Sequence, residues 1–116
     1  MPFAQFEITY SLWEKGLKTE IHAQVAERCI WLPRFGMEYF LPYESDHFTY
    51  FGMGELENYC DMSRSAHMGR FESSADKEYV NYIMPQEHGN HTKTKWLEIQ
   101  DSLHFEGDFE FNVSHY

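Results

Sequence analysis

The sequence predicts an all-β protein, and two observations lead to that fold class. Aromatic residues make up 18% of the 116 residues and outweigh leucine and valine in the apolar set, a composition that favours pleated sheets. Several segments alternate apolar and polar side chains with a period of two, which is the pattern of a strand with one buried face. A chain of this length fits one domain with a real core, so we expect a single all-β domain over residues 1–116.

The first elements are predicted to form a β-hairpin. Apolar and polar side chains alternate over residues 5–12, and the alternation returns over residues 17–25. Residues 14–16, which end in a glycine, supply the turn between the two runs. The hairpin should therefore have one apolar face and one face toward water.

Further strands are predicted along the rest of the chain. Phe35, Met37, Tyr39 and Leu41 share a face in a run that Pro42 closes. The predicted strands after the hairpin are residues 34–41, 47–53, 78–84, 92–99 and 108–113, the last with Phe109, Phe111 and Val113 inward. Residues 61–77 lose the alternation and contain several serines, which predicts a long irregular connection that could include one helical turn.

Charge and composition exclude several kinds of partner. Nineteen acidic residues against nine basic ones give a formal charge of −10, which would repel a nucleic acid or an anionic membrane. No apolar run approaches the roughly 20 residues that span a bilayer, and the N-terminus has no export signal. We expect a soluble, cytoplasmic chain in which Cys29 and Cys60 are free thiols.

A dense group of polar side chains follows the predicted strand 78–84. Pro85 cannot donate a ladder hydrogen bond, so the strand should end before it. Gly89 and Asn90 belong to the residue types that best adopt positive φ in a tight turn. Two interpretations stay open here: a binding site, or a polar connection whose side chains cap their own backbone. The polar residues of the group are Gln86, Glu87, His88 and Asn90.

Candidates for chemistry in this chain are weak. Glycoside hydrolysis needs two carboxylates roughly 5 to 9 Å apart, but with nineteen acids some pair always looks suitable, and a solvated acidic surface is the simpler interpretation. Zinc donor types stand close together at Glu87, His88 and His91, in a turn and without a partner motif. Cys60 has no basic neighbour to activate it. The carboxylates considered are Glu55, Glu57, Asp61 and Glu87.

Aromatic side chains next to amides and carboxylates are also typical of sugar binding, because a ring can stack on the C–H face of a pyranose. Tyr50, Tyr59 and Trp96 are the candidates for such stacking, with Phe51 and Tyr82 as further rings. Core packing is the more ordinary role for most of them.

Three ordered motifs carry a family resemblance, and the closing residues 107–116 add to it. Together they resemble the C-terminal small-chain domain of β-galactosidases of glycoside hydrolase family two, the group of the bacterial lac-operon enzyme. The motifs are Trp31-Leu-Pro-Arg34-Phe-Gly36, Tyr50-Phe-Gly52-Met-Gly54-Glu-Leu-Glu57-Asn58-Tyr59-Cys-Asp61 and Tyr82-Ile-Met-Pro85-Gln86-Glu87-His-Gly89-Asn90.

The resemblance implies an antiparallel β-supersandwich like that of galactose mutarotases, here only a truncated part of it. It also implies that a separate barrel domain of a larger, magnesium-dependent enzyme hydrolyses terminal β-D-galactosides such as lactose. This chain is then expected to hold no catalytic residue, metal or cofactor, and to be inactive alone. Its partners would be the remaining domains of the parent enzyme and, through them, galactosides. The chain ends directly after a predicted strand, which also suggests a piece of something longer.

The resemblance further implies that seven motif residues hold loops that form one wall of the active-site region. The family usually has arginine where this chain has Met62 and His91, and proline where it has Glu55 or Leu56. Without those arginines the bidentate donors that brace nearby carboxylates are lost, so the motifs here fit a scaffold better than ligand contacts. The seven residues are Arg34, Glu57, Asn58, Asp61, Gln86, Glu87 and Asn90.

Two other functions stay open from the sequence. One is a free-standing carbohydrate-binding module that uses Tyr50, Tyr59 and Trp96 as a platform, and the other is a self-sufficient hydrolase. A truncated sandwich would leave unpaired strand edges and bare aromatic surface, so we expect the isolated chain to self-associate.

Overall fold

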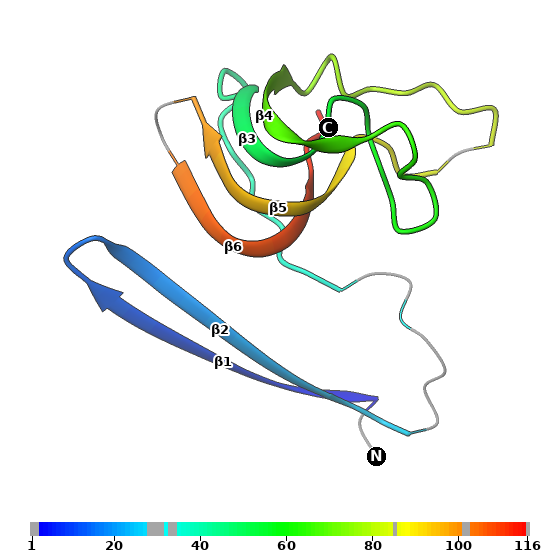
Figure 1. The fold of residues 1–116 in the computed structure, drawn as a ribbon. Helices are drawn as coiled ribbons and strands as arrows, with labels where there is room; N and C mark the ends of the chain where they lie inside the picture. The colour runs from blue at the N-terminus through cyan, green and yellow to red at the C-terminus, as the bar shows by residue number, and fades with distance from the viewer. Residues whose placement is uncertain (1–2, 28–31, 33–34, 85, 101–102, 116) are drawn as a thin grey trace. The chain divides into compact units, whose positions relative to one another are not determined.

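The computed structural model describes residues 3–27, 32, 35–84, 86–100 and 103–115. Contacts divide the chain into two compact units, Met1–Tyr39 and Phe40–Tyr116. The regular secondary structure among the described residues consists of β-strands alone. They form two antiparallel sheets, and Figure 1 labels the strands. The predicted all-β class is confirmed, and two antiparallel sheets are consistent with the β-sandwich class. None of the described segments forms a helix with the length and apolarity needed to cross a bilayer.

The first unit contains the predicted hairpin. Strand β1 (Ala4–Trp13) pairs with β2 (Gly16–Val25) over ten residue pairs, from Ala4 opposite Val25 to Trp13 opposite Gly16. Apolar residues face each other across the pair, for example Ile8 opposite Ile21, which supports the strand pairing through side-chain contact. These apolar side chains are largely exposed, and the side chain of Leu12 reaches 83% exposure.

The second unit is a four-stranded antiparallel sheet in the order β4-β3-β5-β6. Its strands are β3 (His47–Gly54), β4 (His67–Ser74), β5 (Asn90–Ile99) and β6 (Leu103–Asn112), and Figure 1 shows them strongly curved. They confirm the strands predicted at 47–53, 92–99 and 108–113, although β6 begins earlier than predicted. The buried core consists of Phe48, Tyr50, Leu97 and Ile99, against which pack Leu41, Phe71, Phe105, Phe109, Phe111 and Val113.

A change of register in β5 explains both the curvature and the mixed burial pattern. The pairing with β6 shifts between His91 and Thr94 and again between Thr94 and Trp96, and Lys93 has a positive φ of 52°. Such bulges bend a strand and raise its twist. As a result Thr92 and Thr94 are buried in one half of the strand, whereas Leu97 and Ile99 are buried in the other.

The irregular connection predicted over residues 61–77 is wrong, because β4 occupies its second half. The strand alternates, but its inward positions carry Gly69, Phe71 and Ser73, while the residues between them are exposed. Since β4 lies at the edge of the sheet, it buries little apolar surface. One aromatic residue between a glycine and a serine does not produce the apolar pattern on which the prediction relied.

The strands predicted over residues 34–41 and 78–84 are also wrong. Residues 35–41 form no strand, and this run crosses the boundary between the two units at Tyr39; Arg34 lies outside the described residues. Residues 78–84 form a turn and a loop, in which the side chain of Glu78 is buried and that of Met84 is exposed. Alternation of apolar and polar residues did not produce a strand in either segment, because a strand also needs a neighbouring strand to which its backbone can hydrogen-bond.

Candidate functional site

Glu57 joins the segment that follows β3 to the segment that enters β5. Its Oε2 accepts a hydrogen bond of 2.7 Å from the backbone N–H of Gly89, and its Oε1 accepts one from the Tyr82 hydroxyl. Gly89 has a positive φ of 70°, and a Cβ there would lie 2.9 Å from the Cβ of Glu78. A glycine is therefore required where the backbone passes this close to Glu78.

Asn58 is the buried centre of the same joint. Its side-chain amide donates to the backbone oxygens of Met53 at 2.9 Å and Leu56 at 3.0 Å. Its Oδ1 accepts from the backbone N–H of Thr92 at 2.9 Å and from the Thr92 hydroxyl at 2.6 Å. Because both amide hydrogens and both lone pairs of the side chain are used, Asn58 can be fully buried without an unpaired polar atom.

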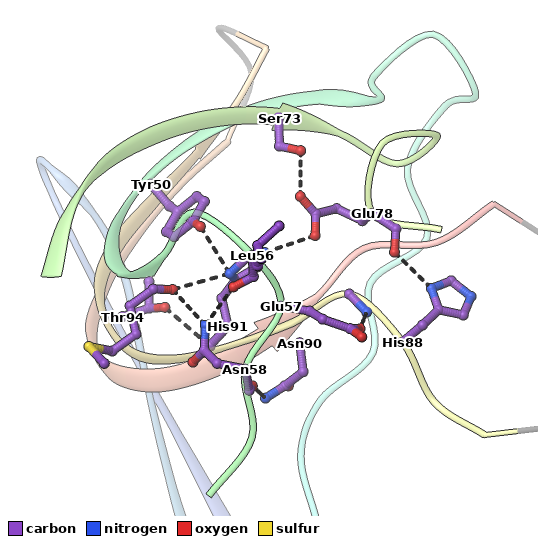
Figure 2. Close-up of polar contacts among 12 residues, drawn as sticks. Tyr50, Leu56, Glu57, Asn58, Ser73, Glu78, His88, Asn90, His91 and Thr94 are labelled. Atoms are coloured by element: carbon purple, nitrogen blue, oxygen red, sulfur yellow. Dashed lines mark hydrogen bonds and ion pairs between the residues drawn. The ribbon is translucent and has the colours of Figure 1, made fainter. Parts of the chain in front are cut away.

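Asn90 completes the connection with two further hydrogen bonds. The Asn58 N–H donates to the Asn90 backbone oxygen at 2.7 Å, and the Asn90 side-chain amide donates to the Asn58 backbone oxygen at 2.9 Å. The two asparagines thus bind each other although 32 residues separate them. Figure 2 shows Asn58, Asn90 and His91 close together. We call Glu57, Asn58, Gly89, Asn90 and Thr92 the asparagine joint.

A buried ionisable pair lies beside the asparagine joint. His91 is fully buried, and its Nε2 lies 2.9 Å from Oε2 of Glu78, which is 7% exposed. Glu78 also accepts a hydrogen bond from the Ser73 hydroxyl. A carboxylate oxygen is the acceptor in this contact, with the Nε2–H of His91 as the donor.

The other ring nitrogen of His91 suits both protonation states of the ring. Nδ1 lies 2.9 Å from the Tyr50 hydroxyl and 3.1 Å from the Met53 backbone oxygen. A neutral ring accepts from the hydroxyl of Tyr50, and a protonated ring donates to the oxygen of Met53. Burial, and then the negative charges of Glu78 and Glu55, raise the pKa of Tyr50 well above its ordinary value, so this hydroxyl keeps its proton.

Two further tyrosines around the asparagine joint have raised pKa values. Burial is the first cause that raises the pKa of Tyr59 to about 12, and the charges of Glu57 and Glu87 add to it. Its hydroxyl oxygen is buried without a hydrogen-bond partner among the described residues. The nearby Asn90 backbone acts in the other direction and partly lowers the pKa. For Tyr82 the hydrogen bond to Glu57 is the main cause that raises the pKa.

One group among the described residues has donors close enough to share a cation. Oxygen and nitrogen atoms of Asp46, Asp76 and His115 all lie within 4.8 Å of one another. His115 Nε2 faces Asp76 at 3.5 Å, and the Asp76 side chain is largely exposed, so an ordinary ion pair accounts for the contact. The zinc donors considered in the sequence are otherwise engaged, since His88 donates to the Glu78 backbone oxygen and His91 is held as described above.

The structure brings three of the seven motif residues into one hydrogen-bonded group. Glu57, Asn58 and Asn90 meet in the asparagine joint, whereas Asp61, Gln86 and Glu87 have exposed side chains. The Asn112 side chain donates to Glu87. Arg34 lies outside the described residues.

The three residues considered for sugar stacking do not form one platform. Tyr50 is fully buried in the core, where no sugar can reach its ring. Trp96 pairs with Phe51, and the next pair along the two strands is Tyr50 with Leu97. Because successive residues of a strand point to opposite faces, Trp96 lies on the face of the sheet opposite to Tyr50. There its ring stacks against His104 at a centroid distance of 6.2 Å. Tyr59 is partly buried near the asparagine joint.

The sequence motifs do not include Thr92, the partner of Asn58, or Glu78 and Ser73, which form a hydrogen-bonded chain with the neighbouring His91. His91 stands out in the sequence only as a departure from the family pattern and as a zinc donor. The polar residues Thr92 and Thr94 at alternating inward positions of a predicted strand were the available signal, since a buried polar side chain must find a partner.

Comparison with known proteins agrees with the motifs. A family described as "Beta galactosidase small chain" matches residues 1–116. The Beta-galactosidase of Actinobacillus pleuropneumoniae is 31% identical over 112 residues, which are 95% of this chain and 11% of the relative. For the Beta-galactosidase of Photobacterium profundum, identity is 34% over 93% of this chain and 11% of the relative.

A third relative, the Beta-galactosidase of Vibrio cholerae, is 39% identical over 85 residues, which are 73% of this chain and 8% of that protein. The chain thus spans about a tenth of the length of these relatives. With all 116 residues matched by the family, the chain belongs to the β-galactosidase small-chain family.

Proposed function

We propose that this chain is a non-catalytic part of a β-galactosidase, in which a separate barrel domain hydrolyses terminal β-D-galactosides such as lactose. Membership of the small-chain family supports this, as does the tenth of its relatives' length that the chain spans. Its partners are the remaining domains of that enzyme and, through them, galactosides. Magnesium belongs to the barrel domain, and the whole protein is cytoplasmic.

The single observation that best supports a scaffold role is the closed hydrogen bonding of the asparagine joint. Asn58, Asn90 and Thr92 bind one another, and Glu57 uses both oxygens to hold Tyr82 and Gly89. A catalytic carboxylate needs room for substrate and an unoccupied acceptor. In this proposal the asparagine joint therefore fixes the two loops that form part of the wall of the active-site region.

The experiment is to change Glu57→Gln in the complete polypeptide that contains this chain. Glutamine removes the charge and keeps only one acceptor oxygen, so it cannot accept from both the Tyr82 hydroxyl and the Gly89 N–H as the carboxylate does, at a cost of about 1–3 kcal/mol. We expect a lower melting temperature and slower hydrolysis of a nitrophenyl galactoside. Glu55→Gln, two residues earlier and exposed, is the matched control and should leave both unchanged. Wild-type activity and melting temperature in the Glu57→Gln variant would contradict the proposal.

Binding of free sugar by this chain is the competing function. Titration calorimetry of the 116-residue chain with galactose and with lactose tests it. We expect no heat of binding, because Tyr50 is buried and Trp96 lies on the other face of the sheet. Millimolar or tighter binding would favour a carbohydrate-binding module instead.

Self-association of the isolated chain is part of the same proposal. The hairpin exposes one row of apolar side chains, which include Phe6, Ile8, Tyr10 and Leu12. An exposed strand edge next to such a row is a template for another copy.

A further inference from the structure

The loop between β4 and β5 carries apolar side chains that are unusually exposed. Ile83 is 101% exposed, as much as in an extended peptide, Met84 is 75% exposed and Tyr79 is 63% exposed. Figure 1 shows this yellow-green to yellow segment running away from the four-stranded sheet and back. Single exposed apolar residues are ordinary, but three within six residues of one loop form a candidate contact surface. We call Ile83 and Met84 the apolar loop tip, while Tyr79 lies at the base of the loop.

The base of this loop is held by specific contacts. On the near side, His88 Nδ1 donates to the backbone oxygen of Glu78 at 3.1 Å, and the rings of Tyr79 and His88 meet edge to face at 5.0 Å. Toward the tip, the Tyr82 hydroxyl donates to Glu57, which also binds the backbone of Gly89. A loop fixed in this way presents its apolar side chains at a set position, which lowers the entropy lost when a partner binds.

The chemistry of the tip selects the kind of partner. Ile83 and Met84 offer no hydrogen-bonding groups to sugar hydroxyls, and the formal charge of −10 opposes nucleic acid and anionic lipid. An apolar recess on another protein surface fits them. The relatives are roughly ten times longer than this chain, so under the proposed function most of the enzyme's surface lies outside these residues, and that is where such a recess is sought.

We infer that the apolar loop tip inserts into an apolar recess on the remainder of the β-galactosidase polypeptide, and so attaches the asparagine joint to the rest of the enzyme. This inference rests on the proposed function. It adds the residues that make the contact and the apolar nature of the surface that receives them.

Amide hydrogen exchange tests the inference. Exchange over residues 79–84 is measured in the 116-residue chain and in the complete polypeptide. We expect exchange to be roughly tenfold or more slower in the complete polypeptide. The variant Ile83→Ser/Met84→Ser should remove that protection, and Ile83→Leu/Met84→Leu, which keeps the side chains apolar, should retain it.

Several outcomes would overturn the inference. Equal exchange rates in both proteins would do so, and so would protection that persists in the serine variant. Protection that develops in the 116-residue chain as its concentration rises would show a second copy to be the partner. Galactosidase activity is assayed in parallel: an active polypeptide with an unprotected loop refutes only the docking, and a protected loop in an inactive polypeptide refutes only the proposed function.

Discussion

The hairpin of the first unit and the four-stranded sheet of the second differ in what stabilises them. The hairpin pairs ten residues of β1 with ten of β2 through neighbours in sequence, and its apolar side chains stay exposed. The four-stranded sheet buries Phe48, Tyr50 and Leu97 and also encloses a polar network. The pairing of the hairpin is therefore local in sequence, whereas the second unit depends on polar partners that lie far apart in sequence.

The charged pairs show the same difference. In the hairpin, Lys18 and Glu20 lie 2.8 Å apart with both side chains about half exposed, and this ion pair lowers the pKa of Glu20. In the second unit, His91 and Glu78 make a contact of almost the same length, 2.9 Å, with both side chains buried. Solvent screens the first pair, so it adds little stability, whereas the second cannot lose a partner without leaving a buried polar group unpaired.

The largest effect is expected from His91→Leu. This change leaves the Glu78 carboxylate buried without its partner, which should lower the free energy of unfolding by about 3–5 kcal/mol. Urea unfolding followed by tryptophan fluorescence measures it. The double variant His91→Leu/Glu78→Leu should recover part of the loss, since no charge then remains buried.

His104→Leu is the matched control for that experiment. His104 lies 3.0 Å from Glu106 with both side chains well exposed, so its loss should cost at most about 1 kcal/mol. An equal loss in the two histidine variants would show that the buried pair has no special weight, and the contrast between the two units would then fail.

An intermediate effect is expected from alkaline pH through Tyr59. Its pKa is about 12 in the folded chain against an ordinary value of 10.0, so the folded state binds the phenol proton more tightly. The stability from this group is complete below pH 10 and is lost as the pH rises through 12. Over this range Tyr59→Phe should lose less stability than the wild type in urea unfolding.

At neutral pH the same variant should cost little, because the Tyr59 hydroxyl is buried without a hydrogen-bond partner among the described residues. Tyr79→Phe, at an exposed position, is the control for the loss of a tyrosine hydroxyl at neutral pH. If the free energy of unfolding fell equally with pH in the wild type and in Tyr59→Phe, burial would not raise the pKa of this hydroxyl.

The smallest effect is expected in the hairpin. Leu12→Ala removes a side chain that is 83% exposed, so at a dilution where the chain is monomeric the free energy of unfolding should change by less than about 0.5 kcal/mol. The same substitution at Leu97, which is 5% exposed in the second unit, should cost about 2–5 kcal/mol. A large loss from Leu12→Ala would show that the apolar face of the hairpin is covered by a partner in solution.

The all-β class, the hairpin and three later strands could be predicted, because each depends on alternation within ten residues or fewer. Strand β4 could not, since Gly69 and Ser73 occupy its inward positions. The site was predicted in part: Glu57, Asn58 and Asn90 were singled out by the family motifs. Their partner Thr92 was not, and neither was Glu78, which pairs with the neighbouring His91. A hydrogen bond across 34 residues, such as that between Asn58 and Thr92, leaves no periodic trace in the sequence.

The register shifts in β5 constrain the length of this strand as well as its composition. Because two residues, Lys95 and Trp96, separate the inward Thr94 and Leu97, removal of Lys95 would restore strict alternation and leave Leu97 and Ile99 facing inward. Removal of the exposed Glu98, which follows the irregular stretch, would instead turn Ile99 to the opposite face and place it in water. Deletions beyond the register shifts should therefore be tolerated far less than exchanges at the same positions, even where the deleted side chain touches nothing in the core.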